Sequence, residues 1–449
     1  MSKNNNDESE EKLNPEDDFD ATEESDKEDV DIGEREIPEL NKPKKQISKK
    51  EWGEIIKENF PDLYPIANIV LAGLGQLLIS DIVNPFGLIL VDKPASGKTL
   101  VLNFFSDIDE LVYADDNFSP ASFVTHAANR KREELADIDL LPKIKDKILL
   151  VREMAPIFGQ SEDKLHSNMT ILTRIFDGEG YLSTTGVHGR RGYKGTFMFV
   201  FLGASTPIQP RIWKLMSSLG SRLFFVNVNS KEKDEEELTD QLLLGPYQKR
   251  LEICKEATSN LIRSIWAKNP KGIIWDSTKT EREYVVMISR IATMLARFRG
   301  AVGMWEVTIN GNMGETKGTK LNHQIPEIEQ PNRINQLLYN FAQGHAVVNG
   351  RDSLTENDIK AALKVALESA PYHRTKLLKF LVKKNGLVNS EEVQKMFGCS
   401  RPTALKEMEF LHVLGIAQRT IDPEGSELKL NGKFQWLIEE KNKWPKLFE

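Results

Sequence analysis

The chain has 449 residues, of which 40% are hydrophobic and 28% are charged, and its net charge is -7. This composition excludes a fibrous or wholly disordered chain, and the length predicts two or three domains. Overall acidity would normally argue against nucleic-acid binding, but the charge is unevenly placed. Residues 1–40 contain 17 acidic and four basic side chains, so they carry -13 and the remainder carries +6.

The segment over residues 1–47 is an acidic tail followed by a lysine-rich linker. With so many charges and so few aromatic side chains, it cannot bury enough apolar surface to offset the entropy lost on ordering. We therefore expect it to be disordered. Two roles fit such a tail: a solubilising segment, or a nucleic-acid mimic that competes for the mildly basic body.

Signals for membranes, secretion and metal binding are missing from the sequence. The most apolar run, residues 66–79, is short and contains glycines and polar residues, so it predicts a buried helix. The N-terminus lacks the pattern of a secretory signal peptide. Cys254 and Cys399 stand far apart, without the spacing of a zinc site or a disulfide framework. We expect a protein of the cytoplasm or nucleoid that is not secreted and has no membrane partner.

Residues 48–230 alternate between strand and helix patterns, which predicts an α/β domain with a parallel sheet. Ser48 and Glu51 form a capping-box pattern at the first helix. Short apolar runs typical of buried parallel strands follow along the chain. These runs cover residues 86–91, 148–151, 197–202 and 223–228.

Residues 231–370 are predicted to be helical. Apolar side chains recur at helical spacing in 242–266, 284–298 and 334–347. A glycine-bearing stretch over 300–330 interrupts this pattern, and we expect it to be a loop or hairpin insertion.

The first apolar strand leads directly into the sequence DKPASGKTL, residues 92–100. A strand, a tight loop and a helix start turn several main-chain N–H groups toward one point, which suits a phosphate. The candidates for nucleotide contact are Lys93, Pro94, Ala95, Ser96, Gly97, Lys98, Thr99 and Leu100.

Two of these side chains would carry the chemistry. Lys98 would reach the β- and γ-phosphates of ATP, and the Thr99 hydroxyl would bind Mg²⁺. The full pattern G-x-x-x-x-G-K-[ST] lacks its first glycine, since Asp92 stands there. A coincidental turn is the alternative interpretation.

A P-loop NTPase also needs an acidic residue at the end of a neighbouring strand. Glu153 follows the run over 148–151, 55 residues beyond Lys98, and would polarise the attacking water. Arg152 occupies the position where an Asp usually holds Mg²⁺ through water, which puts hydrolysis in question more than binding. The alternative is a strand that ends in a solvated Arg–Glu pair.

The order of these motifs resembles an AAA+ ATPase. In that family a polar residue at the end of the third strand contacts the γ-phosphate, a role that falls on Ser205 or Thr206. Arg222, before the fourth strand, matches the arginine finger, whose guanidinium enters a neighbouring subunit's site. The resemblance therefore implies a homo-oligomeric ring, with a hexamer favoured. An ordinary ion pair of Arg222 is the alternative.

Two further segments resemble the minichromosome-maintenance helicases. Residues 181–195 are similar to the hairpin that those helicases project into their central channel. It would carry four DNA contacts, His188, Arg190, Arg191 and Lys194. A solvated basic turn is the alternative.

The segment PNRINQLL at 331–338 resembles the lid of those helicases, with Arg333 in the sensor 2 position. Thr355 and Asp358 form an N-terminal cap for a later lid helix.

Residues 371–449 resemble a winged-helix domain. Helices are predicted over 374–384, over 391–397 with Ser390 as the cap, and from Arg401 onward, followed by wing strands over 416–421 and 429–438.

In winged-helix domains the third helix enters the major groove of DNA. Arg401, Thr403 and Lys406 are then the candidates for DNA contact, with Arg419 and Lys433 on the wing. Because acidic residues lie on the same helix, a role in binding protein stays open.

Together these features predict an ATP-dependent, DNA-binding AAA+ ATPase, a helicase or a motor that remodels DNA at replication initiation. Its cofactors would be ATP and Mg²⁺, and its partner DNA. Two alternatives remain. One is a nucleotide-switched DNA-binding regulator with little turnover, which Arg152 and the irregular loop favour. The other is a protein-remodelling ATPase whose C-terminal domain holds a protein partner.

Overall fold

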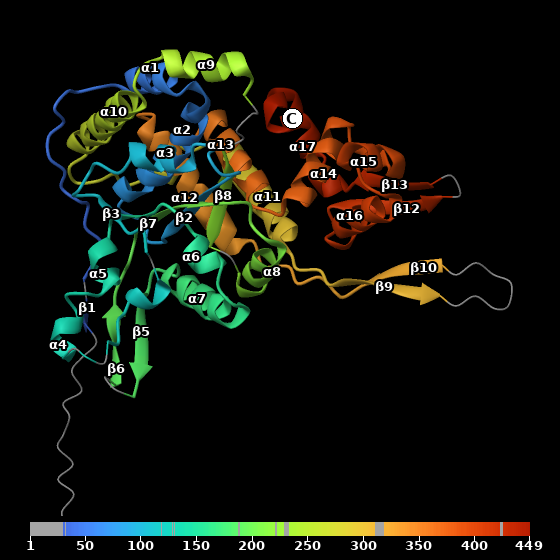
Figure 1. Ribbon diagram of the computed structural model, residues 1–449, viewed down its shortest axis with the longest axis horizontal. Coiled ribbons are helices and arrows are strands. Elements are labelled where there is room, and N and C mark those ends of the chain that lie inside the picture. Colours follow the sequence, from blue (N-terminus) through green and yellow to red (C-terminus); the bar gives the residue numbers. More distant parts are fainter. Residues whose placement is uncertain are drawn as a thin grey trace, which may run out of the picture.

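The computed structural model describes residues 30–449 except 32, 118, 128, 130, 187–188, 221, 229–232, 310–317 and 423–424. His188, a predicted DNA contact, lies outside the described residues. A five-stranded parallel sheet forms the centre and carries helices on both faces (Figure 1). In spatial order its strands are β3 (Val112–Ala114), β4 (Ile148–Val151), β7 (Val200–Ser205), β2 (Phe86–Val91) and β8 (Leu223–Asn227).

The predicted α/β architecture is therefore confirmed at the level of the sheet. The strands at 86–91 and 148–151 have the predicted bounds, and the third begins at Val200 instead of residue 197. Sequence patterning missed β3, because it is short and only partly buried at the edge of the sheet. Both faces of β2 are covered: Leu88 and Leu90 contribute to one apolar cluster, and Ile89 contributes to the other.

The helices of this region fall into two layers. The layer on one face contains α1 (Lys49–Asn59), α2 (Tyr64–Gly75) and α3 (Lys98–Phe104). The layer on the other contains α5 (Leu140–Ile144), α6 (Ala155–Phe158), α7 (Glu162–Ile175) and α8 (Pro210–Leu219). The short helix α4 (Arg132–Leu135) lies near a hairpin at the bottom of Figure 1.

The helical region follows the sheet and shares the α1–α3 face with it. Its helices are α9 (Glu235–Leu243), α10 (Tyr247–Lys268), α11 (Arg282–Arg299), α12 (Asn332–Val348) and α13 (Glu356–Glu368). The single helix expected over 242–266 is two helices, because Gly245, with a φ of 96°, and Pro246 interrupt it. The insertion at 300–330 is a hairpin, β9 (Met304–Ile309) and β10 (Gly318–His323), which projects away from the body (Figure 1).

Aromatic side chains join the sheet to this region. The Phe86 ring of β2 stacks on Phe224 of β8 at 5.2 Å and on Phe341 of α12 at 5.5 Å. The same apolar cluster continues into the C-terminal region as far as Phe448. Buried side chains thus cross both expected domain boundaries, at residues 230 and 370.

Helices α2 and α12 touch backbone to backbone. A Cβ on Gly75 would lie 2.4 Å from the main-chain oxygen of Gly344, and a Cβ on Gly344 would lie 2.4 Å from that of Ala72. Only glycine allows so close an approach, since real Cβ atoms do not come within 3.0 Å of a neighbouring atom.

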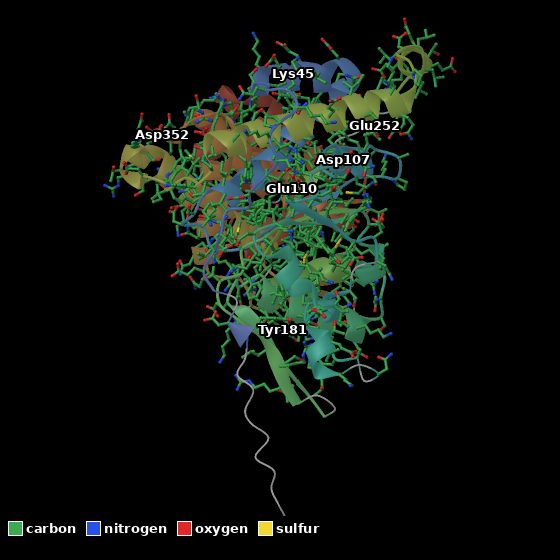
Figure 2. All side chains as sticks on the ribbon, turned by 90° about the vertical axis from the view of Figure 1, so that its left-hand side faces the viewer. Lys45, Asp107, Glu110, Tyr181, Glu252 and Asp352 are labelled. Carbon is green, nitrogen blue, oxygen red and sulfur yellow. The ribbon has the colours of Figure 1, made fainter. Side chains whose placement is uncertain are left out.

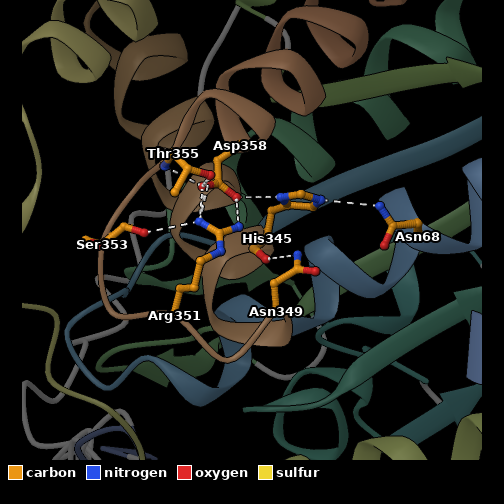
Figure 3. A network of polar contacts seen from close by, with 7 residues as sticks. All are labelled: Asn68, His345, Asn349, Arg351, Ser353, Thr355 and Asp358. Atoms are coloured by element: carbon orange, nitrogen blue, oxygen red, sulfur yellow. Dashed lines mark hydrogen bonds and ion pairs between the residues drawn. The ribbon is translucent and has the colours of Figure 1, made fainter. Parts of the chain in front are cut away.

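A buried polar network secures the same crossing (Figure 3). His345 of α12 bonds the fully buried Asp358 of α13 through Nδ1 at 2.5 Å, and its Nε2 lies 3.3 Å from Nδ2 of Asn68 on α2. Burial alone would raise the pKa of Asp358, but hydrogen bonds from Arg351 and His345 lower it to about 2. The predicted cap is confirmed, since Thr355 N–H donates to Asp358 at 2.7 Å.

The segment 33–47 corrects one expectation, because it packs on the body and is not disordered. The Arg35 guanidinium is buried, donates to Asp146 at 2.9 Å, and also donates to main-chain oxygens of Leu77 and Ile82. Ile47 lies in the core. Long-range partners order this segment, and its composition does not reveal them.

The C-terminal region contains three helices and a three-stranded antiparallel sheet in the order β11-β13-β12. Its elements are α14 (Tyr372–Lys383), β11 (Leu387–Asn389), α15 (Ser390–Phe397), α16 (Arg401–Val413), β12 (Ala417–Asp422), β13 (Gly425–Leu430) and α17 (Trp436–Lys443). The cap of α15 is Asn389 and not Ser390. The second wing strand ends at Leu430, because Asn431 caps a helical turn there.

Arg374 anchors this region to the helical one. Its guanidinium donates to the main-chain oxygens of Phe298 and Gly300 at 2.7 and 2.8 Å, and lies 5.1 Å from the Phe410 ring centroid. Burial lowers the pKa of Arg374 to about 10. None of the described helices has the length and apolar character needed to cross a membrane.

The α2–α12 contact leads to the first prediction. Substitution Gly344→Ala should lower the free energy of unfolding by about 1–3 kcal/mol, because the new methyl group must push the two helices apart. Urea unfolding followed by circular dichroism measures this. The control is Gly73→Ala in α2, whose Cβ would lie 3.5 Å from the Phe86 ring, an ordinary contact. An equal effect of both substitutions would contradict the close-contact interpretation.

Candidate functional site

The loop between β2 and α3 has a backbone that glycine makes possible. Gly97 has a φ of 93°, and a Cβ there would lie 2.9 Å from the Leu63 side chain. Ala95 also has a positive φ, of 61°. The Lys93, Pro94 and Ala95 side chains are exposed, as is that of Thr99. The predicted candidates for nucleotide contact therefore form one loop at the carboxyl edge of the sheet.

Lys98 lies at the centre of this loop and is only 7% exposed. Its Nζ donates to the main-chain oxygens of Asp92 and Lys93 at 2.8 and 2.6 Å, and to Ser96 Oγ at 3.3 Å. Burial lowers the pKa of Lys98, against the opposing effects of Asp92 and Glu153. A desolvated ammonium held by neutral oxygens gains energy from an anion, so the loop fits a phosphate group.

The sheet register brings two other predicted residues to the same edge. Val91 of β2 is paired with Ser205 of β7, and Asp92 N–H donates to the Ser205 carbonyl at 3.3 Å. Strand β4 lies on the other side of β7, so the acidic strand is next but one to β2 and not its direct neighbour. Glu153 follows β4, is exposed, and accepts a hydrogen bond from Ala155 N–H at 3.1 Å.

Arg152, beside Glu153, is held by partners that the sequence did not indicate. It donates to both carboxylate oxygens of Asp116 at 2.8 and 2.9 Å, and to Asn103 of α3 at 3.0 Å. Asp116 follows β3, the strand that sequence patterning missed. A cation thus occupies the place where a carboxylate would hold Mg²⁺. Among the described residues no group of three or more His, Cys, Asp or Glu side chains could bind a metal ion.

Arg222 and Arg333 lie together, but away from the Lys98 loop. Both contact Asp177 Oδ1, at 2.8 and 3.1 Å, and Arg222 is buried. Arg222 directly precedes β8, whose Leu223 is paired with Gly87 at the start of β2. The loop follows the end of β2, so the two sites lie about 13 Å apart along the strands. Neither arginine therefore belongs to the loop of its own chain.

The predicted basic hairpin is confirmed as β5 (Gly180–Thr185) paired with β6 (Gly189–Lys194). Figure 2 shows Tyr181 where this hairpin leaves the body. Arg190 and Lys194 are exposed, as predicted, but Arg191 is buried and bonds Asp139 at 2.6 Å. Arg191 is thus a structural residue of the hairpin and not a surface for DNA.

Asp139 is the acceptor that fixes the base of the hairpin. It is fully buried, and besides Arg191 it receives hydrogen bonds from Tyr193 OH at 2.7 Å and Thr125 N–H at 2.6 Å. Burial, followed by the bond to Asp139, raises the pKa of Tyr193. No local pattern marks Asp139, because its partners are distant in the sequence.

The C-terminal candidates divide in a similar way. Arg401, Thr403 and Lys406 share the exposed surface of α16, and Lys433 is exposed. Arg419 is not an open wing residue, since it bonds Glu409 of α16 at 2.6 Å and is 11% exposed.

Comparison with protein-family models and with curated proteins gives no match to either. A cavity of about 440 Å³ lies between residues 41–44 and α10, with Asp107 and Glu252 at its wall (Figure 2). It does not include the Lys98 loop. Its lysine, arginine and carboxylate side chains are of mixed charge, so it favours no ligand class.

The Asp139 contacts lead to the second prediction. Substitution Asp139→Asn should reduce the free energy of unfolding by about 3–5 kcal/mol, because it leaves the Arg191 guanidinium buried without its counter-charge. Urea unfolding measures this, and limited proteolysis reports on the hairpin. Exposed Asp137→Asn is the matched control. Equal stability of both variants would contradict this role of Asp139.

Proposed function

We propose that this chain is an ATP-binding, DNA-binding ATPase of the AAA+ kind, which couples nucleotide turnover to remodelling DNA. One observation carries the proposal: the loop of Lys98, the end of β7 at Ser205 and the acidic Glu153 meet at one edge of a parallel sheet. Ligands of open α/β sheets bind at the carboxyl ends of the strands.

Each residue at this edge has a chemical task in the proposal. Lys98 supplies a desolvated positive charge to the phosphates, and the exposed Thr99 hydroxyl suits an oxygen-preferring cation such as Mg²⁺. ATP, when bound, supplies the phosphoryl group whose hydrolysis drives the motor. Glu153 would accept a proton from water, and Ser205 would orient that water.

The separation of the arginines supports an assembly of several copies. Arg222 and Arg333 lie at the opposite edge of the sheet from Lys98, so they would serve a phosphate only on a neighbouring copy. A closed ring of identical copies uses such head-to-tail contacts. The buried pair of Arg222 with Asp177 would then have to open on assembly.

The third prediction tests nucleotide binding. Lys98→Ala should weaken ATP binding about 10- to 100-fold, the usual value of a lost charge-assisted hydrogen bond. Lys93→Ala is the control, because the main-chain oxygen of Lys93 and not its amine contacts Lys98. Calorimetric titration with Mg²⁺–ATP measures both. Unchanged binding in Lys98→Ala would show that the loop does not hold the nucleotide.

A second candidate function is a nucleotide-controlled DNA-binding switch with little turnover. The bonding of Arg152 to Asp116 and Asn103 favours it, since a cation replaces the expected metal-holding carboxylate. Phosphate release by wild type and Glu153→Gln, with and without DNA, separates the two. Turnover that Glu153→Gln abolishes supports the ATPase, whereas binding without turnover in wild type supports the switch.

The fourth prediction concerns DNA contact by α16. Replacing Arg401 and Lys406 together with alanine should weaken DNA binding and lower the slope of log affinity against log salt by about 2, one for each phosphate contact. Fluorescence anisotropy over a salt series measures this. Exposed Lys446→Ala is the control. An unchanged slope in the double variant would mean that α16 does not bind DNA.

A further inference from the structure

The hairpin carries a third strand from the N-terminal segment. Strand β1 (Val30–Asp31) pairs with β6 in parallel, with Val30 opposite Tyr193 and Asp31 opposite Lys194. The sheet order is β1-β6-β5, so β1 covers the edge of β6 that β5 leaves open. Figure 1 shows β1 beside the base of the hairpin. An extended segment is thus bound there by strand addition.

The direction of β1 decides where the preceding chain goes. Strand β6 runs from Gly189, at the turn of the hairpin, to Lys194 at its base. Because β1 is parallel to β6, the chain before Val30 leaves β1 at the end that points toward the turn. Residues 1–29 are therefore delivered along the hairpin toward exposed Arg190.

Contacts after β1 fix this delivery in place. The Gly33 N–H donates to Asp31 Oδ1 at 2.9 Å, and Lys145 Nζ donates to the Glu34 carbonyl at 2.6 Å. The buried Arg35–Asp146 pair follows directly. An attached segment held so close to a surface acts at a high effective concentration there.

The charges of the two partners are complementary. Residues 1–29 contain 13 acidic and three basic side chains, a net charge of -10. The exposed ends of β6 are basic, at Arg190 and Lys194. A polyanion attached beside a basic hairpin resembles the phosphate backbone of DNA in charge.

We propose that the edge and basic end of β6 are a docking site for this chain's own acidic segment, residues 1–29, which competes there with DNA. The competition rests on the DNA-binding function proposed above for the hairpin. The docking itself does not, because it follows from the β1–β6 pairing and the charges.

The test compares three full-length variants with wild type. In the neutral-tail variant the 13 acidic side chains of residues 1–29 become Asn or Gln. In the relocated-tail variant residues 1–29 follow Glu449, so net charge is unchanged but the attachment at β1 is lost. In Val30→Pro the tail keeps its charge, and the new residue removes a main-chain donor from β1.

The fifth prediction is the affinity of these proteins for a labelled oligothymidylate. At about 50 mM salt the neutral-tail and relocated-tail variants should bind about 10-fold more tightly than wild type, and Val30→Pro should fall between them and wild type. At about 500 mM salt the differences should vanish through screening. Wild-type affinity in the relocated-tail variant would overturn the proposal, because net charge and not docking would then set the affinity.

A second measurement does not depend on DNA binding. A labelled peptide of residues 1–31 should bind the neutral-tail variant saturably, and replacing Arg190 and Lys194 with alanine in that variant should abolish the binding. Peptide binding without DNA binding in any variant would keep the docking site and refute the DNA function of the hairpin. Absence of peptide binding would overturn the docking site even if DNA binds.

Discussion

Helices α2 and α12 meet backbone to backbone at Gly75 and Gly344, and the helical region takes its position on the sheet from this crossing. The neighbouring residue, His345, extends the contact into a buried network that reaches Asp358 on α13 and Asn68 on α2. Phe341, one turn earlier on α12, stacks on Phe86 of the central strand. Steric fit, polar bonding and aromatic packing therefore act at one place, and α13 leads from there to the C-terminal region.

The parallel sheet then separates the chemistry between its two edges. The carboxyl edge gathers Lys98, Ser205 and Glu153, because parallel strands all end there. The amino edge carries Arg222 and, through Asp177, Arg333. The basic hairpin also leaves the body before β7 begins. One copy thus displays a phosphate-type loop on one side and basic groups on another, an arrangement that suits contacts between copies and with a polyanion.

Buried ion pairs decide which of the basic residues remain available. Arg35, Arg191 and Arg222 each bond a carboxylate in a largely buried setting, so they hold segments together and are costly to expose. Arg190, Lys194 and the basic face of α16 remain exposed. The acidic N-terminal segment and the exposed basic groups of the hairpin are then natural partners, and the pairing of β1 with β6 brings them together.

The sequence alone determined the features that depend on local patterns. Buried apolar runs predicted four of the five sheet strands, the order of turn and helix signals located the Lys98 loop, and Thr355 with Asp358 predicted a cap. Only the tertiary structure decided which charges are paired. Asp116, Asp139 and Asp177 carry no local signal, because each meets arginines far away in the sequence. The same holds for segment 33–47, whose polar composition predicted disorder until Arg35 found a buried partner in Asp146. Local propensity acts over a few residues, whereas burial and ion pairing depend on which distant surfaces the folded chain brings together.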